Sequence, residues 1–361
     1  MQNYYALILA GGGGTRLWPV SRKDKPKQML SLVNDHTLFQ MAVQRLLPLF
    51  PAERIYVVTG QNYVDGMSED APEIPLENFI AEPFGRDNGP AVALGLAAIH
   101  HRDSSAIVAM VTADHHIADE ERFRRALQAS YELAILNKIV TLGITPSYAA
   151  TGFGYIQRGT KEGQFSGFDA YRTLKFTEKP NQTTAERMVA SRQYSWNSGM
   201  FIWSAQRGLE EFASQQPLIH ELIEQIRPSI NTPQFSEQVS LFWDKMPKIS
   251  IDYAIMEHTN DIIVIPVNIG WSDVGTWDSV FDILEKDGLD NCISGKLADK
   301  YIPLHSNRIF VKSDRLVVAI GVTDLIVIET EDVLMICHKD HTQNVKAVVQ
   351  DLGSNGYSEY L

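Results

Sequence analysis

A run of glycines near the N-terminus is the segment whose residue types most clearly indicate chemistry. An apolar strand pattern leads into Gly11, Gly12, Gly13 and Gly14, which are followed by Thr15 and Arg16. Glycines permit positive φ angles and let backbone N–H groups approach an oxyanion closely, so the run suits polyphosphate binding. Pro26 fixes the local backbone and gives Lys27 a defined direction back toward the loop. Arg16 and Lys27 are therefore the candidate cations of a phosphate site.

Two common phosphate-binding motifs do not fit this run. A Walker A loop would end in Gly-Lys-Ser or Gly-Lys-Thr, which Thr15-Arg16 does not supply. A dinucleotide fingerprint that started at Gly11 would need Gly or Ala where Arg16 stands. The glycine run is therefore neither a Walker A loop nor a dinucleotide-binding fingerprint.

The spelling G-x-G-x-R-L-x-P, followed after a short spacer by P-K, resembles the signature of sugar-nucleotide pyrophosphorylases. Here it consists of Gly12, Gly14, Arg16, Leu17, Pro19 and Pro26-Lys27. Residues 17–22 (Leu-Trp-Pro-Val-Ser-Arg) and 26–28 (Pro-Lys-Gln) are similar to the mannose-1-phosphate guanylyltransferase branch. The resemblance continues through Asp273 and covers most of the chain.

Residues 81–91 resemble a nucleotide-binding segment of that branch and imply this role for Glu82, Arg86 and Asn88. Guanine presents two N–H donor groups on one edge, and the carboxylate of Glu82 can accept from both. A helix is expected to open at Ala91, so the N–H groups of the loop before it are free for a ligand. On their own, Glu82 and Arg86 could also form an ordinary surface ion pair. Asn88 and Gly89 replace the branch's usual Thr-Ala.

Two aspartates are candidate metal ligands. Asp114 ends an apolar strand pattern at residues 107–112, and substrates of α/β sheets bind at such strand ends. Mg²⁺ prefers one or two carboxylates together with water and substrate phosphates. The resemblance implies that Asp114 and Asp273, the latter within Trp-Ser-Asp-Val-Gly-Thr-Trp, hold Mg²⁺. Asp273 alone could equally be a helix N-cap. His115 and His116 point apart because they are adjacent, which disfavours a zinc site.

Three further segments resemble the family's sugar-phosphate site. They imply sugar-phosphate binding by Gly152, Gly154, Tyr155, Glu178, Lys179 and Asn197. Glu178 can accept two sugar hydroxyls, and Lys179 can meet the phosphate as a point charge. Taken alone, an adjacent Glu-Lys is usually a solvated surface pair, and Asn197 could close a turn. We interpret Ser250 as an N-cap and Asp252 as a structural residue that favours the helix dipole.

The elements that would position these residues alternate between strands and helices. Strands are predicted at 5–10, 54–59, 107–112, 139–143 and 200–203, and helices at 38–47, 91–100, 120–137 and 183–191. Near-continuous apolar strands separated by helices indicate an α/β domain with a doubly wound, mostly parallel sheet. The resemblance implies a Rossmann-like, GT-A-like nucleotidyltransferase fold for it.

The pattern changes near Leu289. Short strands are predicted at 308–311, 316–320, 325–329 and 333–338, without helical periodicity between them. We therefore expect a catalytic domain at 1–288 and a small all-β domain at 289–361, for which the resemblance implies a left-handed β-helix. Four such short strands cannot bury both faces alone, so we expect a homodimer contact there.

Composition excludes several classes of protein. The chain has 361 residues, a formal charge of −12 and only two cysteines, Cys292 and Cys337. The negative charge argues against non-specific nucleic-acid binding. No segment is long and apolar enough for a membrane span, and the first strand pattern lacks a basic flank typical of a signal peptide. A cytoplasmic location is expected, since neither a disulfide framework nor a zinc motif is indicated.

The resemblance implies transfer of GMP from GTP to mannose 1-phosphate, which gives GDP-mannose and pyrophosphate. Another hexose or heptose 1-phosphate, or another nucleotide, is an open alternative within the same class. A non-catalytic sugar-nucleotide sensor is an alternative of another class, and loss of Lys27 or Asp114 would have favoured it. Both residues are present.

Overall fold

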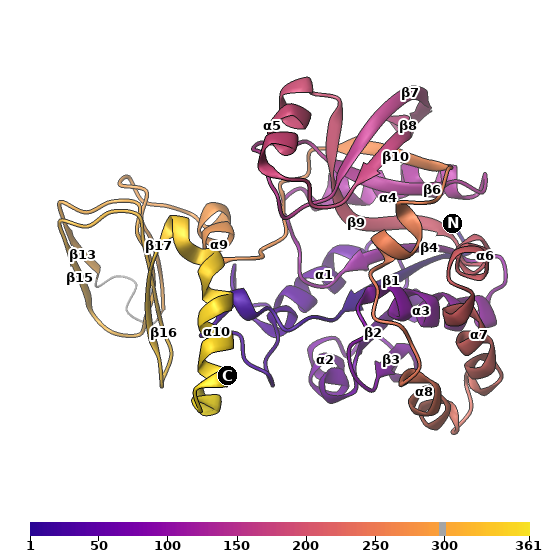
Figure 1. Ribbon diagram of the computed structural model, residues 1–361, viewed down its shortest axis with the longest axis horizontal. Coiled ribbons are helices and arrows are strands. Elements are labelled where there is room, and N and C mark those ends of the chain that lie inside the picture. Colours follow the sequence, from indigo (N-terminus) through magenta and orange to yellow (C-terminus); the bar gives the residue numbers. More distant parts are fainter. Residues whose placement is uncertain (296–300) are drawn as a thin grey trace. The chain divides into compact units, whose positions relative to one another are not determined.

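A computed structural model describes residues 1–295 and 301–361. Contacts between Cα atoms divide it into two compact units. The first comprises residues 1–11, 40–113 and 117–271, and the second comprises residues 12–39, 114–116 and 272–361. Each unit therefore combines segments that lie far apart in the sequence (Figure 1).

The first unit is built on a nine-stranded sheet with the order β3-β2-β1-β4-β9-β6-β10-β8-β7. Strands β3, β2, β1 and β4 run parallel, as do β6 and β10, whereas β9, β8 and β7 pair antiparallel with their neighbours. The bounds are β1 Tyr4–Ala10, β2 Ile55–Gly60, β3 Phe79–Glu82, β4 Ile107–Thr112, β6 Ile139–Ile144, β7 Tyr155–Phe165, β8 Phe168–Thr177, β9 Tyr194–Ser204 and β10 Ile262–Val267. A two-residue strand, β5 (His116–Ile117), pairs with β11 (Trp271–Ser272).

Helices cover both faces of this sheet, because successive side chains of a strand point to opposite sides. On β1, Tyr5 and Leu7 belong to the core around α3, whereas the hydroxyl of Tyr4 donates to Leu127 O in α4. Gly95 lets α3 lie against β1, since a Cβ there would be 2.6 Å from the Leu7 side chain. The helices are α1 Leu38–Leu46, α2 Val64–Asp70, α3 Asn88–Arg102, α4 Glu120–Ala134, α5 Gln182–Ser191, α6 Ala205–Gln215, α7 Pro217–Ile226 and α8 Phe235–Trp243.

The second unit carries parallel strands that stack in register. Phe310 pairs with Ile326 and Tyr301 with Val317, so both pairs are sixteen residues apart, as expected for successive turns of a β-helix. Its small core contains Ile309, Val311 and Ala319. The elements are α9 Trp277–Ile283, β12 Cys292–Ser294, β13 Tyr301–Leu304, β14 Phe310–Lys312, β15 Val317–Ile320, β16 Leu325–Glu329, β17 Leu334–His338 and α10 Val345–Ser354.

The predicted fold class is confirmed: an α/β sheet domain is followed by β-helix-like strands. The predicted helices and strands all occur, with ends that shift by a few residues. The predicted ranges do not include several other elements, among them strands β7 and β10 and helices α6, α7, α8 and α10. A helical signal for α10 is visible in hindsight, because Val345, Val348 and Leu352 recur at spacings of three and four residues. No helix among the described residues could cross a bilayer.

Candidate active site

The glycine loop begins where β1 ends and turns through two left-handed residues. Gly12 has φ 101° and Gly14 has φ 59°, conformations that favour glycine. Gly14 also lies directly against Lys27, since a Cβ at position 14 would be 2.4 Å from Lys27 Cβ. The hydroxyl of Ser21 donates to Gly14 O at 2.8 Å and closes the loop. The loop backbone is therefore fixed against the base of the lysine side chain.

Lys27 brings the two predicted metal-binding segments together. Only 7% of the residue is exposed, and its Nζ donates to Asp114 Oδ2 at 2.8 Å and to the backbone carbonyl of Asp273. Burial acts to raise the pKa of Asp114, but the Lys27 ammonium and His115 outweigh it and hold this pKa below its usual value. Asp114 therefore remains a carboxylate at neutral pH.

Asp114 and Asp273 are the carboxylates predicted to bind Mg²⁺, and Asp273 Oδ1 accepts from Gly275 N at 3.3 Å. Among the described residues there is no group of three or more His, Cys, Asp or Glu side chains placed to hold a metal. A site built from Asp114 and Asp273 would therefore offer one or two carboxylates and leave room for water and phosphate oxygens, which is the set that Mg²⁺ prefers. A Cβ at Gly275 would lie 2.4 Å from Asp273 Oδ2, so a side chain there would displace the Asp273 carboxylate.

Arg16, the other predicted phosphate-binding cation, follows the loop in a short 3-10 helix at Thr15–Leu17. Its Nη1 donates to the side-chain oxygen of Gln343 at 3.2 Å, and the pair is exposed. This contact to the C-terminal part of the second unit was not foreseen from the sequence.

Glu82, the predicted guanine-binding residue, ends strand β3 and is 6% exposed. Among the described atoms its buried Oε1 has no hydrogen-bond partner. Burial, with a smaller contribution from the charge of Asp87, raises its pKa to about 7. Buried acceptors normally have a hydrogen-bond partner. Glu82 Oε1 can therefore accept a hydrogen bond from an N–H group of a ligand. The alternative of a surface ion pair with Arg86 is not seen: Arg86 donates to Asp244 O at 2.7 Å instead.

Asn88 and Gly89, the two departures from the branch's usual spelling, are joined to residues 249–251. The side-chain oxygen of Asn88 accepts from Ile251 N at 2.7 Å, and Gly89 N donates to Ile249 O at 3.0 Å. A Cβ at position 89 would lie 2.5 Å from that same carbonyl oxygen. Asp87 precedes them with φ 64° and accepts from Asn88 N.

The predicted sugar-binding residues converge within the first unit. Asn197 N donates to Gly154 O at 2.8 Å, and a Cβ on Gly154 would lie 2.4 Å from Glu178 Oε2. A side chain at position 154 would therefore displace the Glu178 carboxylate. Tyr155 is fully buried and its hydroxyl donates to Ala150 O, so this side chain anchors the loop. A Cβ on Gly152 would meet nothing within 4 Å, so the backbone there is open.

Lys179 and Glu178 form an ion pair of unequal exposure. Their Nζ–Oε1 distance is 2.8 Å, and the side chains are 57% and 8% exposed. Burial acts to lower the pKa of Lys179, but the hydrogen bond and charge of Glu178 raise it overall. The lysine therefore stays charged while its ammonium is accessible to a phosphate.

Asp252, for which the sequence predicts a structural role, contacts one of the predicted sugar-binding residues. It begins a short π-helix, Asp252–Met256, and so does lie in a first turn, as predicted. Its carboxylate, however, accepts from Asn197 Nδ2 at 2.8 Å, and burial followed by the charge of Glu178 raises its pKa to about 7. Glu257, at the end of the same turn, accepts from Glu178 N at 3.3 Å. In the sequence, Asp252 and Glu257 lie between the predicted site segments around Asn197 and Asp273, and only this position could have indicated that they lie near the site.

Two known families match separate regions of the chain. The family described as "Nucleotidyl transferase" matches residues 5–288, and "MannoseP isomerase/GMP-like beta-helix domain" matches residues 299–352. These matches define a nucleotidyltransferase with an appended β-helix domain.

Several relatives show which branch of the nucleotidyltransferases this chain is similar to. The chain is 37% identical to mannose-1-phosphate guanylyltransferase RfbM of Salmonella typhimurium, over 99% of this chain and 74% of the relative. It is 36% identical to a mannose-1-phosphate guanylyltransferase of Escherichia coli K12, over 99% and 75%. A solved Thermus thermophilus structure titled mannose-1-phosphate geranyltransferase is 31% identical, with a TM-score of 0.86 over 97% of this chain and 99% of that one. The chain belongs to the mannose-1-phosphate guanylyltransferase branch of the nucleotidyl transferase family.

Proposed function

We propose that the protein transfers GMP from GTP to mannose 1-phosphate and forms GDP-mannose and pyrophosphate. The observation that carries this proposal is the contact of one buried ammonium, that of Lys27, with Asp114 and with the backbone of Asp273, beside a glycine loop. Such a cluster suits a reaction in which phosphate charge must be bound and neutralised. The names of the relatives support the same substrates.

The chemistry requires no activated nucleophile from the protein. A phosphate oxygen of mannose 1-phosphate attacks the α-phosphorus of GTP and forms a new P–O bond. The bond between the α-phosphorus and the α–β bridging oxygen breaks, and that oxygen leaves with pyrophosphate. Because a phosphate monoester is already anionic at neutral pH, positioning and charge neutralisation carry the rate.

Each side chain has a separate task in this proposal. Arg16 and the N–H groups of Gly11, Gly12, Gly13, Gly14 and Thr15 bind the β- and γ-phosphates, and Lys27 binds the α-phosphate. Arg16 exchanges its exposed contact with Gln343 for phosphate. Mg²⁺, held by Asp114 and Asp273, would supply further neutralisation of phosphate charge.

Base and sugar are bound by residues of the first unit in this proposal. Glu82 accepts from the guanine N–H groups through the oxygen that otherwise has no partner among the described atoms, with Arg86 and Asn88 shaping the loop. Lys179 binds the sugar phosphate. Glu178, Asn197 and Asp252 bind sugar hydroxyls, because Asn197 bonds to Asp252 and Glu178 lies beside Gly154. The backbone at Gly152 and Gly154 forms the wall of the sugar site, and the buried Tyr155 anchors this loop.

Pyrophosphate release tests this assignment. Purified protein with Mg²⁺ is assayed with GTP, ATP, UTP and dTTP, each combined with mannose, glucose or another hexose 1-phosphate. The pair GTP and mannose 1-phosphate is expected to be fastest. Faster turnover with UTP or dTTP would reject the guanylyl assignment, and absence of turnover with every pair would favour a non-catalytic sensor.

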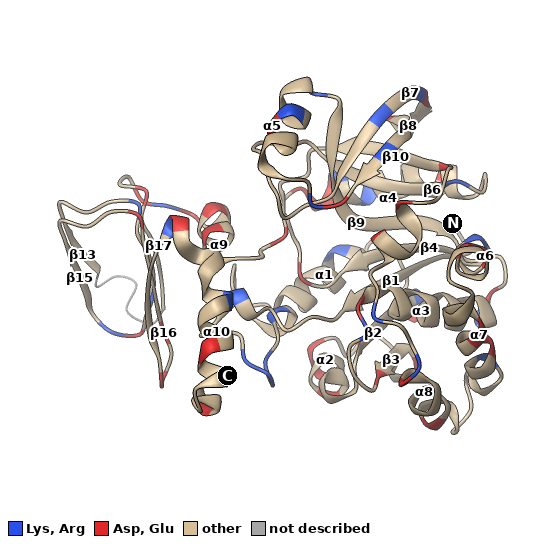
Figure 2. Ribbon diagram, in the orientation of Figure 1, with Lys and Arg blue, Asp and Glu red and all other residues tan. Residues whose placement is uncertain are grey.

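We further propose residues 1–288 as the catalytic domain and 289–361 as a domain that contributes to a homodimer. Strands β13, β15 and β17 present apolar side chains outward, and β13 and β15 carry no charged residue (Figure 2). The exposed residues are Ile302, Leu304, Val318, Ile320, Leu334 and Ile336. A second copy is the occupant that we propose for these side chains. Light scattering should give twice the chain mass, and a monomer would refute the dimer.

The two unpaired cysteines are in keeping with a cytoplasmic location.

A further inference from the structure

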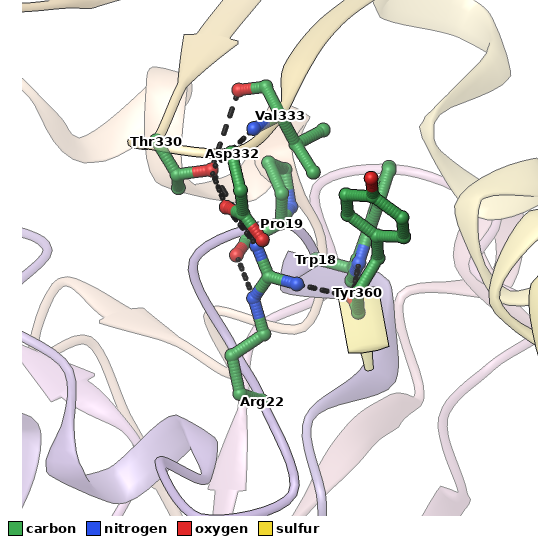
Figure 3. Close-up of polar contacts among 7 residues, drawn as sticks. All are labelled: Trp18, Pro19, Arg22, Thr330, Asp332, Val333 and Tyr360. Carbon is green, nitrogen blue, oxygen red and sulfur yellow. Dashed lines mark hydrogen bonds and ion pairs between the residues drawn. The ribbon is translucent and has the colours of Figure 1, made fainter. Parts of the chain in front are cut away.

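Arg22 lies within the family signature but contacts none of the proposed substrate-binding residues. Its guanidinium instead makes four hydrogen bonds within the second unit (Figure 3). Nε donates to Pro19 O at 2.8 Å, and Nη1 donates to Tyr360 O. Nη2 donates to Asp332 Oδ1 at 2.8 Å and to Thr330 Oγ1 at 3.4 Å. The Arg22 side chain thus connects the family signature with the turn after β16 and with Tyr360 near the end of the described residues.

Neighbouring residues of the signature are attached to the same C-terminal segments. Trp18 Nε1 donates to Tyr360 O at 2.7 Å, so this carbonyl accepts from both Trp18 and Arg22. Trp18 O accepts from Trp277 Nε1, and Arg16 bonds to Gln343. Residues outside the α/β sheet therefore hold the glycine-loop segment at several points.

A short path of fixed backbone connects Arg22 to Lys27. Arg22 N donates to Lys25 O at 3.0 Å, and Lys25 N donates back to Arg22 O at 3.2 Å, which closes a turn. Pro26 then restricts the backbone that leads into Lys27. Displacement of Arg22 would therefore shift the root of the Lys27 side chain and the packing of Gly14 on it.

We propose that Arg22 is a positioning residue through which the β-helix domain and residues 358–361 hold the glycine loop and Lys27 in their reactive arrangement. The catalytic part of this inference rests on the proposed nucleotidyl transfer, whereas the ordering of residues 12–27 does not. A guanidinium is suited to the task because its planar fork can bond three segments at once, which an ammonium cannot do in the same geometry. Misplacement of a reacting group by about 1 Å can cost on the order of a hundredfold in rate.

The test compares Arg22→Ala, Arg22→Lys and Asp332→Asn with the control Arg308→Ala. Arg308 makes two 2.7 Å bonds to Asp324 in the same domain and does not contact the signature. Full-length proteins are compared by melting temperature, by kcat and KM, and by hydrogen exchange of backbone amides 12–27. Arg22→Ala should lower kcat by roughly 10- to 100-fold with KM for mannose 1-phosphate little changed, and should speed exchange at 12–27. Arg22→Lys and Asp332→Asn should show smaller losses in the same direction.

The control should lower the melting temperature without either of these effects. If Arg22→Ala matches Arg308→Ala in kcat and in exchange at 12–27, the proposal is wrong. If Arg22→Ala does not fold, the same comparison is made with Arg22→Lys and Asp332→Asn. If the wild type transfers no GMP, the proposed function fails, and the exchange comparison alone then decides whether Arg22 orders the loop.

Discussion

The side-chain oxygen of Asn88 accepts the backbone N–H of Ile251 at 2.7 Å. Asn88 belongs to the loop proposed to bind the base, and Ile251 immediately precedes Asp252, whose carboxylate contacts Asn197. One hydrogen bond thus lies between the segment assigned to the nucleotide and the segment assigned to the sugar. Gly89 N and Ile249 O add a second bond beside it.

Gly89→Ala should disturb both segments. The new methyl group would lie 2.5 Å from Ile249 O, a backbone atom that cannot move aside cheaply. Overpacking of this kind typically costs roughly 1–3 kcal/mol. We expect a lower melting temperature and higher KM values for both substrates. Gly85→Ala is the matched control for the melting temperature, because a Cβ at position 85 would meet nothing within 4 Å. Equal melting temperatures for the two variants would contradict the close approach.

Asp114→Asn and Asp273→Asn should each reduce kcat by at least about a hundredfold, because the carboxylates are proposed to hold an ion that stabilises transition-state charge. Steady-state pyrophosphate release at saturating Mg²⁺ measures this. Asp261→Asn serves as the control, since Asp261 forms a long 3.7 Å surface pair with Lys138. A near-normal rate for either site variant would remove that residue from the metal site.

Glu82→Gln should weaken the preference for GTP over ATP, because an amide oxygen accepts but its NH₂ group repels a guanine donor. A lost buried pairing of this kind costs on the order of 1–3 kcal/mol. Competition assays between the two nucleotides give the ratio of kcat/KM. Since the pKa of Glu82 is about 7 in the free protein, KM for GTP in the wild type should rise as pH falls from 8 to 6. An unchanged ratio in Glu82→Gln would assign guanine recognition to backbone groups.

Asp252→Asn should raise KM for mannose 1-phosphate about tenfold, which corresponds to the loss of one hydrogen bond to a charged group. KM for GTP should change little. The control is again Asp261→Asn, an equally conservative change at an exposed carboxylate. If KM for the sugar phosphate stays within twofold of wild type, Asp252 has only the structural role that its place in the first helical turn suggests.

The same variant should alter the pH dependence of stability. The pKa of Asp252 is raised from 3.8 to about 7 by burial and by Glu178, against the opposing influence of Asn197 and Lys179. Its contribution to stability is therefore full below about pH 4 and is lost as pH rises through 7. The melting temperature of Asp252→Asn relative to wild type should increase between pH 5 and pH 8. A constant difference would contradict the raised pKa.

Several residues of the proposed site could be predicted because they follow strand patterns or glycine turns. Local motifs separately predict roles for Lys27, Asp114 and Asp273, and the structure brings these three segments together. Asp252 was not recognised as a site residue, because its first-turn position explains an acidic residue without any ligand. The role proposed for Arg22 could not be predicted for a different reason: Tyr360, Thr330 and Asp332, to which its guanidinium donates, lie more than three hundred residues away, and no local pattern indicates such contacts.

The second unit consists of segments that lie far apart in the sequence, and this affects how the chain folds during synthesis. Residues 12–39 belong to the same compact unit as residues 272–361, which are translated much later. Closing a chain segment of this length costs entropy that only the finished contacts can offset. While the sheet strands β1 to β10 are emerging, Lys27 lacks its contact with Asp273 and Arg16 lacks its contact with Gln343. The proposed catalytic centre is therefore complete only once residues 272–361 have been translated.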